Sequence, residues 1–279
     1  MARYKVVGPP GTGKTRRLLK EVHQYVQQGI PLDQIGYFAF TRKAAREARD
    51  RFLVKNIDLT KKDIKYFQTL HSLAFNNLGL KEENVMQEVN YKAIGETCGI
   101  QIKYASHETN NFNGIFSSDS EYLSLINLAR VRQISVGEQF DLNEHLTWIT
   151  REKIIAIETE INNYKKTYGL IDFTDMIQRF LDKGKSPKFK VIFVDEAQDL
   201  SLIQWSMIKK IEAETECDVW IAGDDDQAIF GWAGADVNSF INWKGREILL
   251  DQSQRVPSLI QQKAIDVINR IYYNRIQKN

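Results

Sequence analysis

Short apolar runs alternate along the chain with longer segments in which apolar residues recur at helical spacing. Most of the short runs are apolar throughout, which is typical of parallel strands that are covered on both faces. The runs that predict strands span residues 4–8, 35–40, 64–70, 190–196, 218–223 and 246–251. The helical patterns between several of these runs span residues 14–28, 42–54 and 200–213. This alternation predicts an α/β fold in which a parallel sheet is flanked by helices.

Polar stretches and helical patterns interrupt the alternation between residues 79 and 165. The stretches “ASHETNNFNG” and “FSSDSE” are followed by helical patterns around 120–132 and 143–165. Because the next strand pattern begins only at residue 190, we interpret 79–165 as a mainly helical subdomain inserted into the sheet domain.

The composition is ordinary for a soluble globular protein, with 43% hydrophobic and 27% charged residues among 279. The net charge of +2 neither requires nor excludes a polyanionic partner, so a nucleic-acid surface has to come from local patches. Cys98 and Cys217 are too few for a disulfide framework or a metal cluster, and they suit a reducing cytoplasm. No stretch approaches the roughly 18 apolar residues of a membrane span, and we expect no contact with a membrane.

A phosphate-binding loop is predicted at residues 8–15, “GPPGTGKT”, which match the pattern G-x-x-x-x-G-K-[ST]. A strand pattern precedes these residues and a helical pattern follows them, as this motif requires. Its glycines allow successive N–H groups to point at phosphate oxygens, and the helix N-terminus adds partial positive charge. Lys14 would neutralise the β- and γ-phosphates, and the Thr15 hydroxyl would bind Mg²⁺. The residues expected to contact the nucleotide are Gly8, Pro9, Pro10, Gly11, Thr12, Gly13, Lys14, Thr15 and Arg16.

A pair of carboxylates, Asp195 and Glu196, ends the apolar strand pattern in “KVIFVDEAQD”. Open α/β sheets present ligand-binding groups at this end of their strands. We expect Asp195 to hold Mg²⁺ and Glu196 to act as the general base that polarises an attacking water. Two solvated acids at a strand end are the alternative, which the phosphate loop disfavours.

Taken in chain order, these motifs resemble superfamily 1 helicases of the UvrD/Rep type. Motif I of that family is similar to “GPPGTGKTR”, and motif II to “DEAQD”, with “YGLIDFTDMI” before it. The remaining similarities are “FAFTRKAARE” to motif Ia, “TLHSLAF” to motif Ib, “IAGDDDQAIFGWAGAD” to motif III and “LDQSQRVPSLI” to motif IV.

The resemblance implies a RecA-like ATP-binding domain at 1–78 and 166–250, with the helical subdomain at 79–165 inserted into it. Residues 251–279 would begin a second RecA-like domain. The implied activity is that of an ATP-driven motor, which uses ATP and Mg²⁺ and tracks single-stranded DNA. Gln227 would sense the γ-phosphate, and Arg255 would contact the same group.

The resemblance also implies residues that contact DNA. Phe40 and Trp232 would stack on bases, a grip that tolerates any sequence. Thr41, Thr69 and His71 would bind phosphates or sugars. A place in the core is the alternative for Phe40, His71 and Trp232, although glycines and alanines around Trp232 cannot cover an indole. Within motif III we expect Asp224 near the magnesium water shell, and Asp225 and Asp226 as turn and helix-cap residues.

The sequence departs from the family pattern in three places. It begins almost at the first strand, which leaves no room for the upstream glutamine motif that contacts adenine. Gln254 stands where relatives have a tyrosine that stacks on adenine. The second RecA-like domain is absent beyond its first helix, so we expect this chain to need a completing domain or partner and to unwind nothing alone.

Two other functions remain open at this stage. One is a non-catalytic DNA-binding or regulatory module that keeps a nucleotide pocket without turnover. The other is an unrelated phosphate-loop kinase, which leaves motif III unexplained.

Overall fold

The computed structural model describes residues 1–56, 58–102, 120–143, 148–270 and 275–276. The chain divides into two compact units. The first comprises Met1–Thr69, Ser186–Leu200 and Ile208–Asn279, and the second comprises Leu70–Lys185 and Ser201–Met207.

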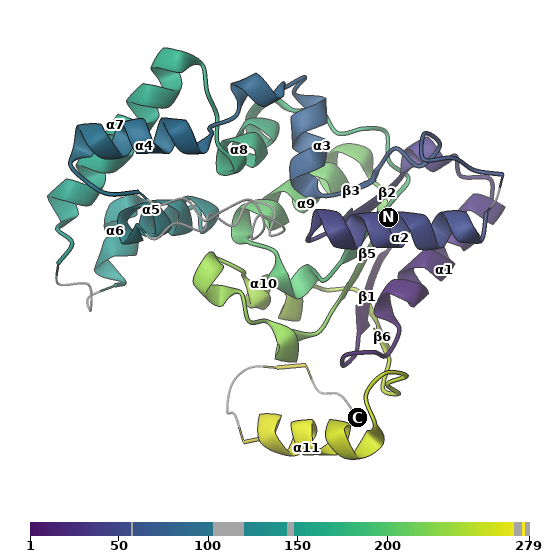
Figure 1. The fold of residues 1–279 in the computed structure, drawn as a ribbon. Helices are drawn as coiled ribbons and strands as arrows, with labels where there is room; N and C mark the ends of the chain where they lie inside the picture. The colour runs from purple at the N-terminus through teal and green to yellow at the C-terminus, as the bar shows by residue number, and fades with distance from the viewer. Residues whose placement is uncertain (57, 103–119, 144–147, 271–274, 277–279) are drawn as a thin grey trace. The chain divides into compact units, whose positions relative to one another are not determined.

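The first unit contains a six-stranded sheet in the order β3-β2-β4-β5-β1-β6, in which all neighbouring strands are parallel (Figure 1). The strands are β1 (Arg3–Val7), β2 (Ile35–Ala39), β3 (Phe67–Gln68), β4 (Val191–Asp195), β5 (Asp218–Gly223) and β6 (Arg246–Leu249). The predicted parallel α/β fold is therefore confirmed.

One predicted strand, 64–70, is wrong in extent. Only Phe67–Gln68 pair with β2, the preceding residues form turns, and Leu70 already begins a helix. The apolar run is shared between these elements because Ile64 is buried from a turn and Leu70 from the helix. An apolar run alone does not distinguish a strand from such a junction.

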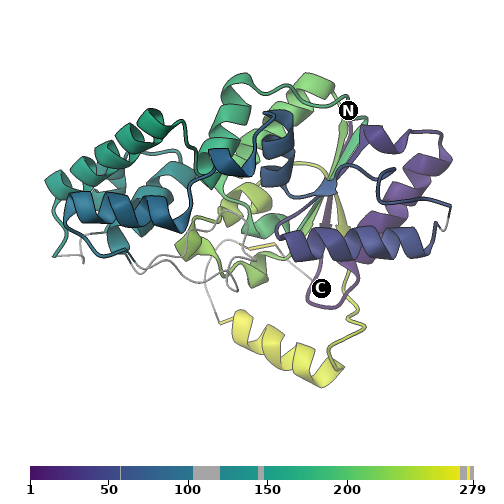
Figure 2. The same cartoon turned by 45° about the horizontal axis from the view of Figure 1, so that its top comes forward.

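Helices α1 (Lys14–Gln27) and α2 (Arg42–Val54) cover one face of the sheet (Figure 2). Side chains alternate along β1, so Val6 points to these helices and Lys5 to the opposite face. There the Lys5 ammonium donates to the Ile241 carbonyl of α10 (Val237–Ile241) at 3.0 Å. The first unit also contains α11 (Ser258–Ile268).

An aromatic ladder crosses the sheet on the face covered by α1 and α2. Its rings come from neighbouring strands in direct register: Phe67, Tyr37, Phe193, Trp220 and Tyr4. Consecutive ring centroids lie 5.1, 6.4, 6.1 and 4.0 Å apart, with interplanar angles of 13°, 22°, 23° and 13°. Cross-strand aromatic pairs of this kind add to the burial energy of each ring.

The second unit is helical, and its core joins α4, α5, α6 and α7. Its helices are α3 (Leu70–Asn77), α4 (Glu88–Cys98), α5 (Glu121–Val131), α6 (Val136–Asp141), α7 (Arg151–Tyr168), α8 (Phe173–Lys183) and the first turns of α9 (Leu202–Thr215). The helical patterns predicted around 120–132 and 143–165 correspond to α5 and α7, although 144–147 and the stretch “ASHETNNFNG” lie outside the described residues. The unit takes in α3 and α8 because these helices pack together. The predicted domain boundaries stay a prediction.

A buried ion cluster joins three helices of the second unit. The Arg130 guanidinium contacts Asp172 and Asp175, each at 2.5 Å, and the Lys165 ammonium contacts the same carboxylates at 2.9 and 2.8 Å. Burial alone would raise the pKa of Asp172, but the two cations outweigh it and lower this pKa well below its usual value. The segment “YGLIDFTDMI” therefore has a structural role in holding α8.

We predict that Phe193→Ala lowers the free energy of unfolding by about 3–5 kcal/mol, because it removes the central ring of the ladder from a fully buried position. Urea denaturation followed by circular dichroism measures the change. Leu259→Ala, at a residue that is 70% exposed, serves as the control and should change stability by less than about 0.5 kcal/mol. Equal stability of the two variants would contradict the structural role of the ladder.

Candidate active site

The predicted site segments of the first unit leave the sheet at one edge. Residues 8–15 follow β1, Phe40 follows β2, Glu196 follows β4 and Asp224 follows β5. Because the strands are parallel, all these carboxyl ends lie at the same edge, where open α/β sheets bind ligands.

The phosphate loop has the backbone that its glycines predict. Gly11 and Gly13 have φ angles of 78° and 90°, in the left-handed region that favours glycine. Helix α1 starts at Lys14 with no acidic residue in its first turn, so its first N–H groups and partial positive charge suit an anion. Lys14 is 7% exposed, and its ammonium donates to the Gly8 carbonyl at 2.8 Å. The loop thus surrounds a buried cation, which fits a phosphate group.

Asp195 and Thr15, the two predicted metal ligands, are in direct contact. The Thr15 hydroxyl donates to Asp195 Oδ2 at 2.7 Å, and the Tyr37 hydroxyl donates to the same oxygen at 2.8 Å. A carboxylate and a hydroxyl from two elements therefore meet, and oxygen ligands of this kind suit Mg²⁺. Tyr37, which sequence reasoning missed, orients Asp195. The only signal was a hydroxyl within the otherwise apolar “IGYFAF”.

Glu196 combines an unusual backbone conformation with a perturbed pKa. Its φ angle is 53°, a left-handed conformation that costs energy for a residue with a Cβ and concentrates at functional sites. Burial raises its pKa first, and the neighbouring Asp195 raises it further, while Lys14 opposes both. A carboxylate with a raised pKa is a stronger base than an ordinary one, which suits a general base.

Gln198 connects the loops after β4 and β5, and sequence reasoning gave it no role. Its Nε2 donates to Glu196 and to Asp199, both at 3.1 Å. Its Oε1 accepts the backbone N–H of Asp224, also at 3.1 Å. Burial, followed by repulsion from Glu196, raises the pKa of Asp199 to about 7. The amide therefore ties two carboxylates of the loop after β4 to the backbone of the loop after β5.

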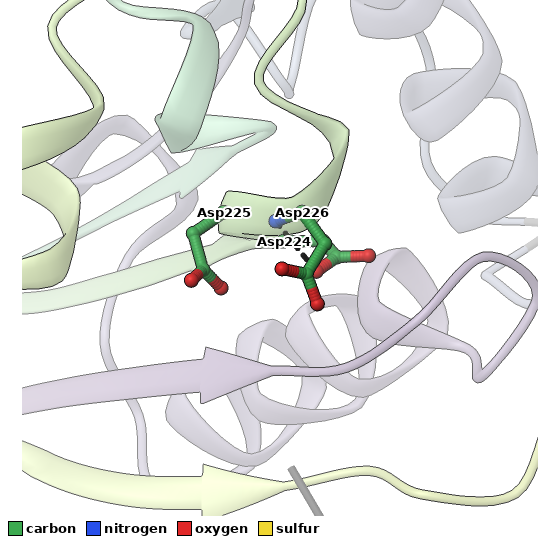
Figure 3. A group of neighbouring side chains, drawn as sticks. All are labelled: Asp224, Asp225 and Asp226. Atoms are coloured by element: carbon green, nitrogen blue, oxygen red, sulfur yellow. Dashed lines mark hydrogen bonds between the residues drawn. The ribbon is translucent and has the colours of Figure 1, made fainter. Parts of the chain in front are cut away.

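The three aspartates after β5 lie next to one another (Figure 3). Asp224 caps the short helix Asp225–Gln227 by accepting the N–H of Asp226 at 3.3 Å, and it also accepts from the Gln227 side chain. Asp225 and Asp226 lie within this turn, as predicted, but the cap role expected among them belongs to Asp224, because a cap precedes the turn that it closes. The expected place of Asp224 near the magnesium water shell stays a prediction. The described structure thus attaches the predicted γ-phosphate sensor, Gln227, directly to Asp224.

The aromatic residues predicted to grip DNA differ in exposure. Trp232 is 67% exposed, as its small neighbours predict, whereas Phe40 is 7% exposed. Phe230 lies between them, with ring centroids 5.6 Å from Phe40 and 6.4 Å from Trp232. The buried Phe40 therefore packs against Phe230, which in turn contacts Trp232. Sequence reasoning missed Phe230, which connects the two predicted residues.

The polar residues predicted to contact DNA are mostly engaged within the protein. Thr41 caps α2 by accepting the N–H of Ala44 at 3.0 Å. Thr69 is 2% exposed in the first unit, and His71 is 8% exposed in the second. Their contacts with DNA stay predictions.

Residues after β6 close over the phosphate loop. The Ser253 hydroxyl donates to the Pro10 carbonyl at 2.8 Å, and the Gln254 N–H donates to the Gly11 carbonyl at 2.9 Å. These bonds place Arg255, whose side chain is exposed, next to the loop. Arg16 is also exposed at the start of α1.

A parallel sheet with this loop after β1 and this acidic end of β4 defines a RecA-like phosphate-loop protein. The family described as UvrD/REP helicase N-terminal domain matches residues 2–246, and the chain belongs to this family. The predicted resemblance is thereby confirmed.

Relatives of known name are similar over nearly the whole chain. The ATP-dependent DNA helicase PcrA of Leuconostoc citreum is 24% identical over 279 residues, which cover 95% of this chain and 37% of that protein. PcrA of Staphylococcus aureus is 22% identical, covering 94% and 37%, and DNA helicase II of Haemophilus influenzae is 26% identical, covering 96% and 38%. The chain thus spans little more than a third of the length of these relatives.

The comparison with solved structures gives only a weak similarity. The solved structure of VirB4 from Thermoanaerobacter pseudethanolicus aligns with a TM-score of 0.32 and 11% identity, a likeness too weak to assign the fold. Among the described residues, the helices are too short or too polar to cross a membrane.

We predict that Asp199→Asn changes how stability depends on pH. With its pKa raised to about 7, the folded Asp199 binds more protons than the unfolded one between about pH 4 and pH 7. The free energy of unfolding of the wild type should therefore fall, relative to Asp199→Asn, by roughly 1–3 kcal/mol as the pH rises from about 5 to about 8. Urea denaturation without nucleotide or magnesium measures this difference. Asp266→Asn, on exposed α11, should keep the wild-type profile, and parallel profiles for both variants would contradict the prediction.

Proposed function

We propose that the chain is the N-terminal motor portion of an ATP-dependent DNA helicase, which binds ATP with Mg²⁺ and single-stranded DNA. The observation that carries this proposal is the segment from Gly223 to Trp232. It leaves the sheet beside the phosphate loop, bears Gln227 near its middle and presents an exposed indole at its far end. One short segment would therefore connect the hydrolysis site with the DNA track.

The residues at the sheet edge divide the chemistry among them. Backbone N–H groups of residues 8–15 and the Lys14 ammonium would bind the phosphates. Thr15 and Asp195 would hold Mg²⁺, which neutralises charge on the phosphate oxygens. Glu196 would take a proton from the attacking water, and its raised pKa suits this role. Gln227 and Arg255 would bind the γ-phosphate from the loops after β5 and β6.

Single-stranded DNA would bind through ring stacking and positioning contacts. Trp232 offers a sequence-tolerant stacking surface worth about 1–3 kcal/mol per base. Phe230 and Phe40 would fix the indole from behind, which reduces the entropy lost on binding. Thr41, Thr69 and His71 would contact the sugar–phosphate backbone.

A completing RecA-like domain or a partner would supply the other side of the nucleotide cleft. The predicted RecA-like domain at 1–78 and 166–250 provides only one side, and an arginine from the opposite side commonly accelerates phosphoryl transfer by about 10³–10⁵. The relatives' greater length supports this proposal. We further place the motor in the cytoplasm, where its two free cysteines would stay reduced.

We predict that Trp232→Ala weakens binding of a fluorescein-labelled oligo(dT) by roughly 5–100-fold, because one stacking contact is lost. Its affinity for a fluorescent ATP analogue should stay unchanged. Lys14→Ala should do the reverse. Trp148→Ala is the matched control, since Trp148 is also exposed, at 61% against 67%, and belongs to the second unit. Unchanged DNA affinity in Trp232→Ala would remove the indole from the proposed track.

We predict that Glu196→Gln abolishes ATP hydrolysis stimulated by single-stranded DNA in the full-length gene product. The amide cannot accept the proton from water, so turnover should fall at least about 100-fold while ATP binding persists. Release of inorganic phosphate measures this. Absence of turnover in the wild-type protein would instead support a non-catalytic module, and phosphate transfer to an acceptor would support a kinase.

A further inference from the structure

Three adjacent carboxylates lie close together at the end of β5. Oxygen atoms of Asp224, Asp225 and Asp226 all lie within 4.8 Å of one another, and Asp224 and Asp225 are 2% and 3% exposed. Like charges in a buried position repel strongly unless cations or N–H groups stabilise them. The contacts of this aspartate triad are therefore part of what fixes the loop that follows.

Two residues that follow α11 in the chain, Arg275 and Ile276, supply such contacts. The Arg275 guanidinium lies 3.0 Å from Asp226 Oδ2, and their side chains are only 13% and 16% exposed. The N–H of the buried Ile276 donates to Asp225 Oδ2 at 2.8 Å. Arg275 also donates to Asn269, the residue that ends α11, at 2.9 Å. One guanidinium thus joins the end of α11 to the triad.

The other end of α11 is attached to the phosphate loop. Ser253 and Gln254, shortly before the helix, bond to the carbonyls of Pro10 and Gly11. None of the eleven residues of α11, all of which the structure describes, is buried. The helix is therefore held mainly through the segments at its two ends, one on the nucleotide loop and one on the triad.

We propose that α11 is a lever between the phosphate loop and the loop that carries Gln227 and Trp232, with Arg275 as the positioning residue at its second attachment. This inference rests on the proposed function. A shift of the phosphate loop moves Ser253 and Gln254, α11 transmits the shift, and Arg275 delivers it to Asp226. The turn that contains Asp226 also holds Gln227, so the DNA-binding segment responds to nucleotide.

The chemistry of Arg275 suits this role. Its planar guanidinium donates to Asn269 through one nitrogen and to Asp226 through another, so it fixes the distance between these two residues. Lysine carries the same charge but cannot span both acceptors in a defined geometry. Alanine leaves a largely buried Asp226 without its cation.

Hydrogen exchange on the purified 279-residue chain tests the attachment without DNA. In Arg275→Ala, the amides of residues 224–232 should exchange roughly tenfold faster than in the wild type, because the triad loses its cation. Arg275→Lys should lie between the two. Arg270→Ala, an exposed arginine next to the same helix, is the matched control and should leave exchange unchanged. Equal exchange in Arg275→Ala and the control overturns the proposal.

The lever itself is tested by the effect of nucleotide on DNA affinity. Oligo(dT) affinity is measured with and without a non-hydrolysable ATP analogue and Mg²⁺, and the ratio reports coupling. Arg275→Ala should reduce the wild-type ratio several-fold towards 1, with nucleotide affinity unchanged, and the swap Arg275→Asp with Asp226→Arg should restore part of it. An unchanged ratio in Arg275→Ala, or a wild-type ratio of 1, overturns the lever. A wild-type chain that binds no oligo(dT) refutes the proposed function and, with it, coupling to DNA.

Discussion

The parallel pairing of the strands is the constraint on which the rest of the structure depends. Because all strands of the sheet point the same way, every connection leaves from the same edge, and groups distant in sequence meet there. Thr15 and Asp195 are 180 positions apart and share a hydrogen bond for this reason. The aromatic ladder fixes the register of the inner strands, so it also fixes which loop residues face one another.

This concentration of loops creates an electrostatic problem. Asp195, Glu196, Asp199 and the aspartate triad all lie at the sheet edge, and the raised pKa values of Glu196 and Asp199 reflect burial close to other acids. Hydrogen bonds from neutral donors reduce the free-energy cost of burying these charges. The donors are Tyr37, Thr15 and Gln198. A nucleotide bound with Mg²⁺ would complement this edge, because its cation suits the acids and its phosphates suit Lys14 and the start of α1.

Local sequence patterns predicted the features that depend on local chemistry. The phosphate loop is recognisable because its glycines and lysine are consecutive, and most strands are recognisable from apolar runs. Tyr37, Gln198 and Phe230 escaped prediction because their roles depend on partners brought close by strand order, such as Asp195 for Tyr37 and Phe40 for Phe230. The run 64–70 misled for a related reason, since burial from a turn and burial from a strand leave the same apolar pattern.

Exposure alone does not make a tryptophan a binding residue, and the chain contains its own comparison. Trp148 is 61% exposed, and its indole N–H donates to Glu121, so this side chain is satisfied at the surface. Trp232 differs because its ring continues a row through Phe230 to Phe40 at the end of β2, while Ile229 beside it is 70% exposed. Leaving this apolar area in water gives up the burial energy that a core position would provide. A row of rings that is buried at Phe40 and exposed at Trp232 would suit the proposed stacking on a flexible strand, since the protein side would then lose little freedom on binding.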